Sequence, residues 1–257
     1  MMRLQSEIKV TVKDKVIGGP KPLVCLPLVA RETSELLEQT ESLKRLAPDL
    51  LEWRIDGFAA VSNVSVCLAA LKELQAAIGN IPLIFTCRIH AEGGLQALPQ
   101  KVRLELVTAA IASGGLDIVD IELCNEPAFI ESVKQTAREN GSKLVLSYHN
   151  FTDTPEAGVI HDKLLQAQDA GADIAKVAVT PKNYADVLVL LSATYEARTG
   201  AVNVPIVTMS MGPEGGVTRV AGGLFGSDIT FAVGKESSAP GQIPIEDLRK
   251  AMAVLYH

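Results

Sequence analysis

The feature that most constrains the fold of this chain is a regular recurrence of short apolar runs. Eight such runs occur, and their starts lie about 25 to 35 residues apart, the length of one strand, one helix and two loops. The runs are PLVCLPL (22–28), LLEWRID (50–56), PLIFTCR (82–88), DIVDIEL (117–123), KLVLSYH (143–149), DIAKVAV (173–179), VPIVTMSM (204–211) and DITFAV (228–233).

The character and number of these runs indicate a barrel. Near-continuous apolar strands are typical of a parallel sheet whose two faces are both buried. Eight βα units close into a (β/α)8 TIM barrel, and 257 residues is an ordinary length for one. The sequence therefore predicts an α/β fold in which residues 1–257 form a single barrel domain, with a small N-terminal β-hairpin at EIKVTVKDKVIGG. An open doubly wound sheet is the alternative, but the expected glycine-rich turn after its first strand is absent from LPLVARETS.

The segments between the strand runs carry helical patterns. RETSELLEQTESLKRLA has apolar residues at three- and four-residue spacing, and so does PEAGVIHDKLLQAQDAG. In the second segment Pro155 follows Thr154, a favourable N-cap residue. This helix is therefore predicted to begin at Pro155.

Composition excludes several classes of partner and site. The net charge is −6 and no long basic block occurs, so nucleic acids and acidic membrane surfaces are not expected partners. No run approaches the roughly 18 apolar residues of a membrane span, and the N-terminus lacks the apolar core of a signal peptide, so we expect a cytoplasmic location. The four cysteines, Cys25, Cys67, Cys87 and Cys124, form no CxxC pair, so neither a metal site nor a disulfide is expected.

Ionisable side chains gather at the ends of the predicted strands, where a TIM barrel carries its active site. Glu52, Arg54 and Asp56 alternate with apolar neighbours and so point to one face. The others at or after strand ends are Arg88, Glu92, Asp120, Glu122, His149, Lys176 and Arg219. Each has a structural alternative, such as a Glu52–Arg54 ion pair, or Asp120 and Glu122 orienting nearby cations. Six of the eight strands nevertheless contribute to the same end, which indicates a polar active site.

Lys176 is the most informative of these residues. It lies inside the apolar run ADIAKVAV, where burying an ammonium is costly. With Arg54, Arg88 and Arg219 expected close by, burial and like charges would favour the neutral amine. A neutral amine attacks a ketone or aldehyde and forms a Schiff base.

Schiff-base chemistry also needs a proton shuttle, and His149 suits that role. His149 ends the preceding strand, and neighbouring strands lie about 4.8 Å apart, so both side chains can face one carbon atom. Glu92 is expected to hydrogen-bond His149, and Arg219 to bind a substrate carboxylate. These residues predict a cofactor-free Schiff-base lyase or aldolase for a small anionic carbonyl compound.

At this point the motifs show a family resemblance. The chain resembles type I 3-dehydroquinate dehydratase over nearly all its length, and the combination of motifs in this order is specific. The motifs are LEWRID (51–56), FTCR (85–88), EGG (92–94), SYHNF (147–151), AKVAV (175–179), VTMSMG (207–212), TRVAGGLFGSDITF (218–231) and SAPGQ (238–242).

The resemblance implies an activity and a set of roles. It implies dehydration of 3-dehydroquinate to 3-dehydroshikimate in the shikimate pathway, by a homodimer that needs no cofactor. Lys176 would be the Schiff-base lysine, His149 the general acid and base, and Glu92 its support. Substrate would be bound by Glu52, Arg54, Arg88, Arg219, Ser238 and Gln242, the last two from a loop that closes over the site. Cys25, where some relatives carry serine, is expected at the barrel mouth.

Two other functions remain open at this stage. A class I Schiff-base aldolase would use a similarly placed lysine, but most such enzymes need a phosphate cradle. The glycine-rich GPEGG (212–216) is interpreted as a plain loop. A non-catalytic barrel that binds a metabolite is the second alternative, and the joint presence of Lys176, His149 and Glu92 argues against it. No dinucleotide-binding motif occurs, so a fused dehydrogenase is not expected.

Overall fold

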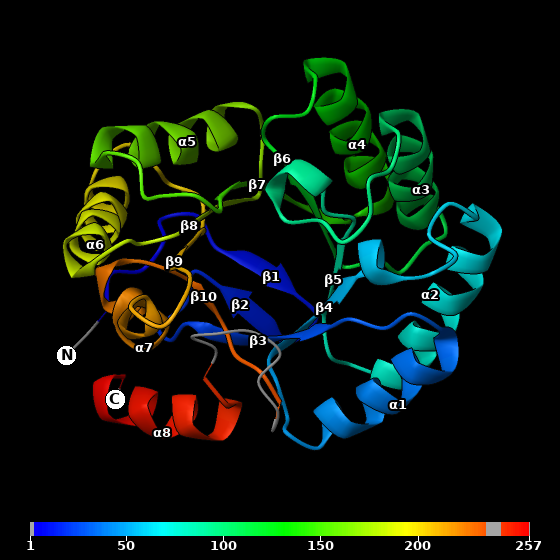
Figure 1. The fold of residues 1–257 in the computed structure, drawn as a ribbon, viewed down its shortest axis with the longest axis horizontal. Helices are drawn as coiled ribbons and strands as arrows, with labels where there is room; N and C mark the ends of the chain where they lie inside the picture. The colour runs from blue at the N-terminus through cyan, green and yellow to red at the C-terminus, as the bar shows by residue number, and fades with distance from the viewer. Residues whose placement is uncertain (1–2, 235–242, 257) are drawn as a thin grey trace.

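A computed structural model of the chain describes residues 3–234 and 243–256. Within these residues a parallel eight-stranded sheet curls into a barrel. The two edges of the sheet approach each other through a bridge between Ile206 and Ser227, so the barrel is nearly closed. Figure 1 shows the helices arranged around the strands. The predicted (β/α)8 barrel with an N-terminal hairpin is confirmed.

The barrel strands match the predicted runs closely. They are β3 (Leu23–Leu28), β4 (Leu50–Arg54), β5 (Leu83–Thr86), β6 (Ile118–Glu122), β7 (Lys143–Asn150), β8 (Ile174–Val179), β9 (Ile206–Ser210) and β10 (Ile229–Phe231). Their order is β10-β3-β4-β5-β6-β7-β8-β9. Only β7 passes the end of its predicted run, by one residue.

A helix follows each barrel strand on the outside. The helices are α1 (Thr33–Lys44), α2 (Val64–Ile78), α3 (Gln100–Ala112), α4 (Pro127–Asn140), α5 (Ala157–Asp169), α6 (Tyr184–Thr199), α7 (Gly216–Phe225) and α8 (Ile245–Leu255), with short 3-10 turns η1 (Ile55–Gly57) and η2 (His90–Glu92). No helix in the described part of the chain is both long and apolar enough to cross a membrane.

The outward faces of the strands bury a large apolar core under these helices. Trp53 on β4 is fully buried there and meets the rings of Phe58 and Phe85 edge-on, at centroid distances of 5.8 and 5.7 Å. Burying a side chain the size of Phe85 stabilises the fold by roughly 1.5–3 kcal/mol. The outer layer therefore holds the barrel rigid, which fixes the positions of the side chains that point inward.

The inward side chains change from apolar to polar along the strands. The lowest layer is an apolar cluster that includes Cys25, Leu50, Ile84, Ile118, Val145, Ile174, Val207 and Ile229. Because strand side chains alternate, the next inward layer lies two residues further along each strand. That layer includes Glu52, Thr86, Asp120, Ser147 and Lys176, whose side chains contact one another. The carboxyl ends of the strands therefore carry the polar groups.

The N-terminal hairpin closes the opposite end of the barrel. Strands β1 (Val10–Val12) and β2 (Lys15–Ile17) pair antiparallel. Val10, Val12 and Ile17 belong to the same apolar cluster as the lowest inward layer. In Figure 1 the hairpin is seen within the ring of barrel strands. With this end covered, the barrel is accessible from the carboxyl ends of its strands.

Two local predictions were wrong. Helix α5 begins at Ala157, not at Pro155, because the hydroxyl of Thr154 donates to the main-chain oxygen of Thr180 at 3.1 Å instead of capping the helix. Cys25 is not at the barrel mouth. It is fully buried in the lowest layer, two residues before Pro27, and burial raises the pKa of its thiol.

Candidate active site

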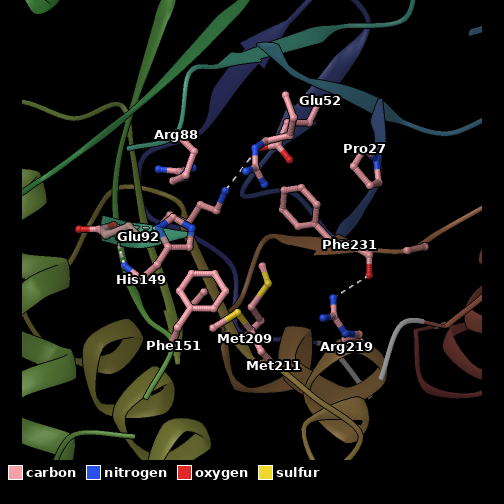
Figure 2. Close-up of a pocket in the computed structure, with 14 residues that line it drawn as sticks. Pro27, Glu52, Arg88, Glu92, His149, Phe151, Met209, Met211, Arg219 and Phe231 are labelled. Carbon is pink, nitrogen blue, oxygen red and sulfur yellow. Dashed lines mark hydrogen bonds and ion pairs between the residues drawn. The ribbon is translucent and has the colours of Figure 1, made fainter. Parts of the chain in front are cut away.

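A cavity of about 170 Å³ opens at the carboxyl ends of the strands. Seven of the residues predicted from the sequence line it, as Figure 2 shows for most of them: Glu52, Arg54, Arg88, Glu92, His149, Lys176 and Arg219. The other two predicted site residues, Ser238 and Gln242, lie outside the described residues. The fold therefore brings together groups from five strands or the segments that follow them: β4, β5, β7, β8 and β9.

Lys176 lies at the bottom of this cavity. Its Nζ is 2.8 Å from Oδ2 of Asp120 and 3.6 Å from Oε1 of Glu52, and it lies 4.9 Å from the centroid of the Phe231 ring. Arg54, Arg88 and Arg219 line the same cavity, as expected, but the charged atoms that contact Nζ are carboxylate oxygens. Attack on a carbonyl carbon requires this amine in its neutral form.

Asp120 links Lys176 to the rest of the polar network. Its Oδ1 accepts from the hydroxyl of Ser147 at 2.6 Å and lies 2.9 Å from a guanidinium nitrogen of Arg88. Burial alone would raise the pKa of Asp120, but Arg88 and Lys176 hold it well below its usual range. Asp120 is therefore a carboxylate held between two cations, the arrangement expected of a group that orients Arg88 and Lys176.

Glu122 forms the next part of this network. Its Oε1 lies 2.9 Å from Nη1 of Arg88, and its Oε2 accepts from Arg103 of α3. Arg103 was missed in the sequence, although a signal was present. The buried residues of α3 recur as 103, 106, 107, 110 and 111, so Arg103 occupies a position on the apolar face of its helix. A charged residue at such a position needs a buried partner.

His149 is held by Glu92 through two hydrogen bonds. The Oε2 atom of Glu92 lies 3.0 Å from the His149 ring Nδ1 and accepts from its backbone N–H at 2.9 Å. Burial, reinforced by Arg88 and Lys176, lowers the pKa of His149 well below its usual value, so the ring is neutral near pH 7. A carboxylate facing Nδ1 favours the tautomer with the proton on Nδ1, which leaves the lone pair on Nε2. His149 is thus prepared to accept a proton.

Glu92 is itself affected by its buried position. Burial raises its pKa from 4.5 to about 6. At neutral pH the side chain is ionised and can accept both hydrogen bonds from His149. Below pH 6 it takes up a proton, and this support weakens.

The two glycines after Glu92 are required by close contacts. Gly93 has a φ of +82°, and a Cβ there would lie 2.3 Å from the ring of Phe151. A Cβ on Gly94 would lie 2.2 Å from the main-chain oxygen of Arg88. The Phe151 ring in turn stacks on His149, with 6.4 Å between centroids. The EGG motif therefore lets a chain turn bring Glu92 and Phe151 against the same histidine.

Two arginines at the rim are held in different ways. Arg54 forms a two-point contact with Asp56 at 2.9 and 2.8 Å, so the alternative of a Glu52–Arg54 ion pair was wrong. Asp56 lies in η1, beyond the end of β4, and is fully buried. Arg219 of α7 donates from Nη1 to the main-chain oxygen of Phe231 at 3.0 Å, as Figure 2 shows. Within residues 3–234 and 243–256, no carboxylate lies within ion-pair distance of Arg219.

The remaining lining of the cavity is apolar. It comes from Pro27, Phe151, Ala178, Met209, Met211, Phe231 and Ala232. Met209 and Met211 alternate at the end of β9, which is the spacing that places both inward. Apolar walls exclude water and strengthen the polar contacts between the charged groups. Among the described residues, no group of three or more His, Cys, Asp and Glu side chains is arranged to hold a metal ion.

Comparisons with known proteins agree on one family. The family model for type I 3-dehydroquinase matches residues 24–257. A curated 3-dehydroquinate dehydratase from Geobacillus thermodenitrificans is 44% identical over 247 residues, which cover 96% of this chain and 95% of the relative.

Solved structures give the same result. The 3-dehydroquinate dehydratase of Geobacillus kaustophilus superposes with a TM-score of 0.94 at 43% identity, covering 97% of both chains. The type I enzyme of Clostridium difficile, solved with covalently modified comenic acid, has a TM-score of 0.94 at 36% identity and covers 97% of this chain and 98% of its own. A 3-hexulose-6-phosphate synthase, at 16% identity and a TM-score of 0.60, shares the fold alone.

Proposed function

The chain belongs to the type I 3-dehydroquinase family, and from this premise we propose that it dehydrates 3-dehydroquinate to 3-dehydroshikimate through an imine on Lys176, with His149 as general acid and base. The observation that carries the proposal is the position of one amine. Lys176 lines the same cavity as the His149–Glu92 pair and is the one lysine that does so among the described residues.

The first step is formation of the imine. Lys176 transfers a proton to His149, and its amine attacks the ketone carbon at C3. His149 then returns that proton to the carbinolamine hydroxyl, so the ring is neutral again once water has left. Loss of water from the carbinolamine leaves a protonated imine. Asp120, at 2.8 Å, and Glu52, at 3.6 Å, stabilise this cation as they stabilise the ammonium. The covalently modified comenic acid in the Clostridium difficile enzyme supports covalent chemistry in a relative.

The second step is removal of a proton next to the imine. The lone pair on Nε2 of His149 takes a proton from C2, and the C–H electrons move into the imine to form an enamine. Glu92 stabilises the imidazolium that results, because its Oε2 lies 3.0 Å from Nδ1. Its role is comparable to the orienting carboxylate of a catalytic triad.

The third step expels the hydroxyl group at C1. The enamine electrons form the C1–C2 double bond, and His149 returns its proton to the departing oxygen, so one water molecule is lost and His149 is again neutral. Hydrolysis of the imine then releases 3-dehydroshikimate and the free lysine. No step requires a metal ion or an organic cofactor.

Substrate recognition is proposed for the charged groups around the cavity. Arg219 suits the carboxylate at C1, because a guanidinium binds a carboxylate at two points. Arg54, Arg88 and Glu52 are proposed to contact hydroxyl groups or balance charge. Ser238 and Gln242 are proposed to complete the contacts from the loop after β10. The carboxylate preference of this set favours the dehydratase over the aldolase alternative.

The test is to trap the imine. The protein is incubated with 3-dehydroquinate and sodium borohydride, and the reduced adduct is located by intact mass and peptide mapping. The expected adduct is on Lys176. The His149→Ala variant should still form an adduct but release almost no product, because proton transfer fails. Product formation without any trappable adduct in the unmodified protein would refute the imine step.

We also propose that residues 1–257 act as one domain in a cytoplasmic homodimer, as the family resemblance implies. Sedimentation equilibrium of the purified chain measures the assembly directly. A mass near 27.3 kDa would show a monomer instead.

A further inference from the structure

We propose that Cys124 is a positioning residue of this enzyme, whose thiol holds the carboxylate of Glu92 in place so that Glu92 can support His149. The inference rests on the proposed function, in which His149 is the general base. It concerns a residue that carries no role in the sequence motifs. Of the four cysteines, Cys124 is the exposed one.

The geometry divides the two oxygens of Glu92 between two partners. Oε2 accepts from the backbone N–H of His149 and faces its Nδ1. Oε1 accepts from Sγ of Cys124 at 3.2 Å. Within the described residues, Cys124 is the only hydrogen-bond donor to Oε1. The thiol therefore fixes the rotation of the carboxylate from the side opposite His149.

The position of Cys124 follows from the strand period. Strand β6 ends at Glu122, and Cys124 lies two residues further along. The alternation that points Asp120 and Glu122 inward continues to Cys124 in the turn after the strand. This spacing is present in the sequence, although the absence of a CxxC pair by itself indicates only free thiols.

The state of the thiol suits donation and not nucleophilic attack. Although the residue is exposed overall, its thiol is partly buried where it meets Glu92. This partial burial, the hydrogen bond to Glu92 and the charge of Glu92 raise the pKa of Cys124 to about 12, so the group is a thiol, and a donor, near neutral pH. A reactive or redox-sensing cysteine has the opposite property, a pKa lowered toward neutrality.

The other charged groups around Glu92 set the background for its titration. Arg88, two residues after β5, favours the carboxylate, and Glu122 of β6 opposes it. From β7, His149 contributes its backbone N–H and ring. From β4, Arg54 donates to the main-chain oxygen of Gly93, the next residue. Cys124 adds a donor to this set, so its loss should make Glu92 harder to ionise.

The test compares two substitutions that separate volume from hydrogen bonding. Cys124→Val approximates the size of the thiol but has no donor, whereas Cys124→Ser keeps a donor on the same carbon. For Cys124→Val we expect kcat to fall about three- to tenfold, the effect of losing one hydrogen bond from a weak donor, with KM nearly unchanged. The acid limb of its kcat/KM profile should move to higher pH by about half a unit. In Cys124→Ser, kcat and the position of the acid limb should both stay close to those of the unmodified protein.

A second measurement does not depend on turnover. Carboxyl NMR of protein labelled with ¹³C-glutamate, with the Glu92 signal assigned by its loss in Glu92→Gln, reports the pKa of Glu92 directly. That pKa should rise in Cys124→Val and return in Cys124→Ser, with thermal unfolding confirming that all variants fold. Equal pKa values in the three proteins would overturn the inference. If the unmodified protein fails to turn over 3-dehydroquinate but the pKa values differ as expected, the positioning contact stands and the proposed function fails.

Discussion

Two clusters of buried charge lie at opposite ends of the barrel, and both combine carboxylates with cations. The mouth cluster consists of Glu52, Arg88, Asp120 and Lys176, and it lies at the carboxyl ends of the strands. The floor cluster consists of Arg3, Arg198 and Asp228, and it lies where β9 and β10 begin. Each centres on a fully buried aspartate that two cations contact.

The floor cluster joins separate segments of the fold. Asp228 binds Arg3 and Arg198 and accepts from the backbone N–H of Ile206 at 2.8 Å. Arg198 also donates to the main-chain oxygens of Val204 and Gly226. The cluster therefore ties the N-terminal segment to the seam where the barrel closes. Its three side chains are not part of the lining of the active-site cavity.

The mouth cluster has similar ion pairs, but it borders the active-site cavity. Glu52, Arg88 and Lys176 all line the cavity, together with the His149–Glu92 pair. Since both ends of the barrel have buried ion pairs and only the mouth borders the cavity, buried ion pairs alone do not mark an active site. What distinguishes the mouth is a solvent-accessible space next to an amine and a neutral imidazole that can exchange protons.

The strongest test of this distinction is Lys176→Met. We expect kcat to fall at least about 1,000-fold, because the nucleophile is lost and no other lysine among the described residues lines the cavity. The midpoint of thermal unfolding should change little, because Asp120 keeps Arg88 and Ser147 as partners. Lys143→Met, at the amino end of β7, is the matched control and should keep full activity. Appreciable turnover by Lys176→Met would remove the amine from the mechanism.

The opposite result is expected for Asp228→Asn in the floor cluster. The amide leaves two buried guanidinium groups without their counter-charge, so the free energy of unfolding should fall by about 3–5 kcal/mol. The kcat of the folded protein should stay within about twofold of the unmodified value, because the cluster does not touch the cavity. Urea unfolding measures the first quantity and initial rates at low temperature the second, with exposed Asp169→Asn as control. A large loss of kcat in fully folded protein would contradict the separation of the two ends.

The smallest expected effect is a pH dependence confined to the mouth. Because the pKa of Glu92 is raised to about 6, kcat/KM should fall as pH decreases through about 6, when protonated Glu92 no longer supports His149. The linkage to stability has the opposite sign. Since the folded pKa exceeds 4.5, this group favours folding below pH 4.5 and loses that contribution as pH rises through about 6. In Glu92→Gln the limb near pH 6 should disappear, and its persistence would assign the titration to another group.

Much of the site was accessible from sequence because strand geometry is simple. A period of two decides which face a strand residue occupies, and all strands of a parallel barrel end on the same side. These two rules are enough to place Glu52, Arg88, His149 and Lys176 around one cavity. They also apply to Cys124, although they do not predict its contact with Glu92.

Two differences between expectation and structure share one physical origin. The hydroxyl of Thr154 was expected to cap a helix, but it donates to the main-chain oxygen of Thr180, 26 residues further along the chain. Lys176 was expected among arginines, but Asp120, 56 residues earlier, lies closer. For these two residues the partner depends on how strands close in space, which local patterns do not encode. Arg54, in contrast, pairs with Asp56, only two residues away, and not with Glu52.

The sequence by itself determined the barrel, its hairpin, the end at which polar groups gather, and the lysine and histidine of the proposed reaction, because apolar periodicity and strand alternation act over a few residues. The tertiary structure decided which charges touch: Asp120 beneath Lys176, Arg103 behind Glu122, and Cys124 against Glu92. Such pairings depend on distances of about 3 Å between atoms far apart in the chain, and only the closed, packed barrel sets distances of that size.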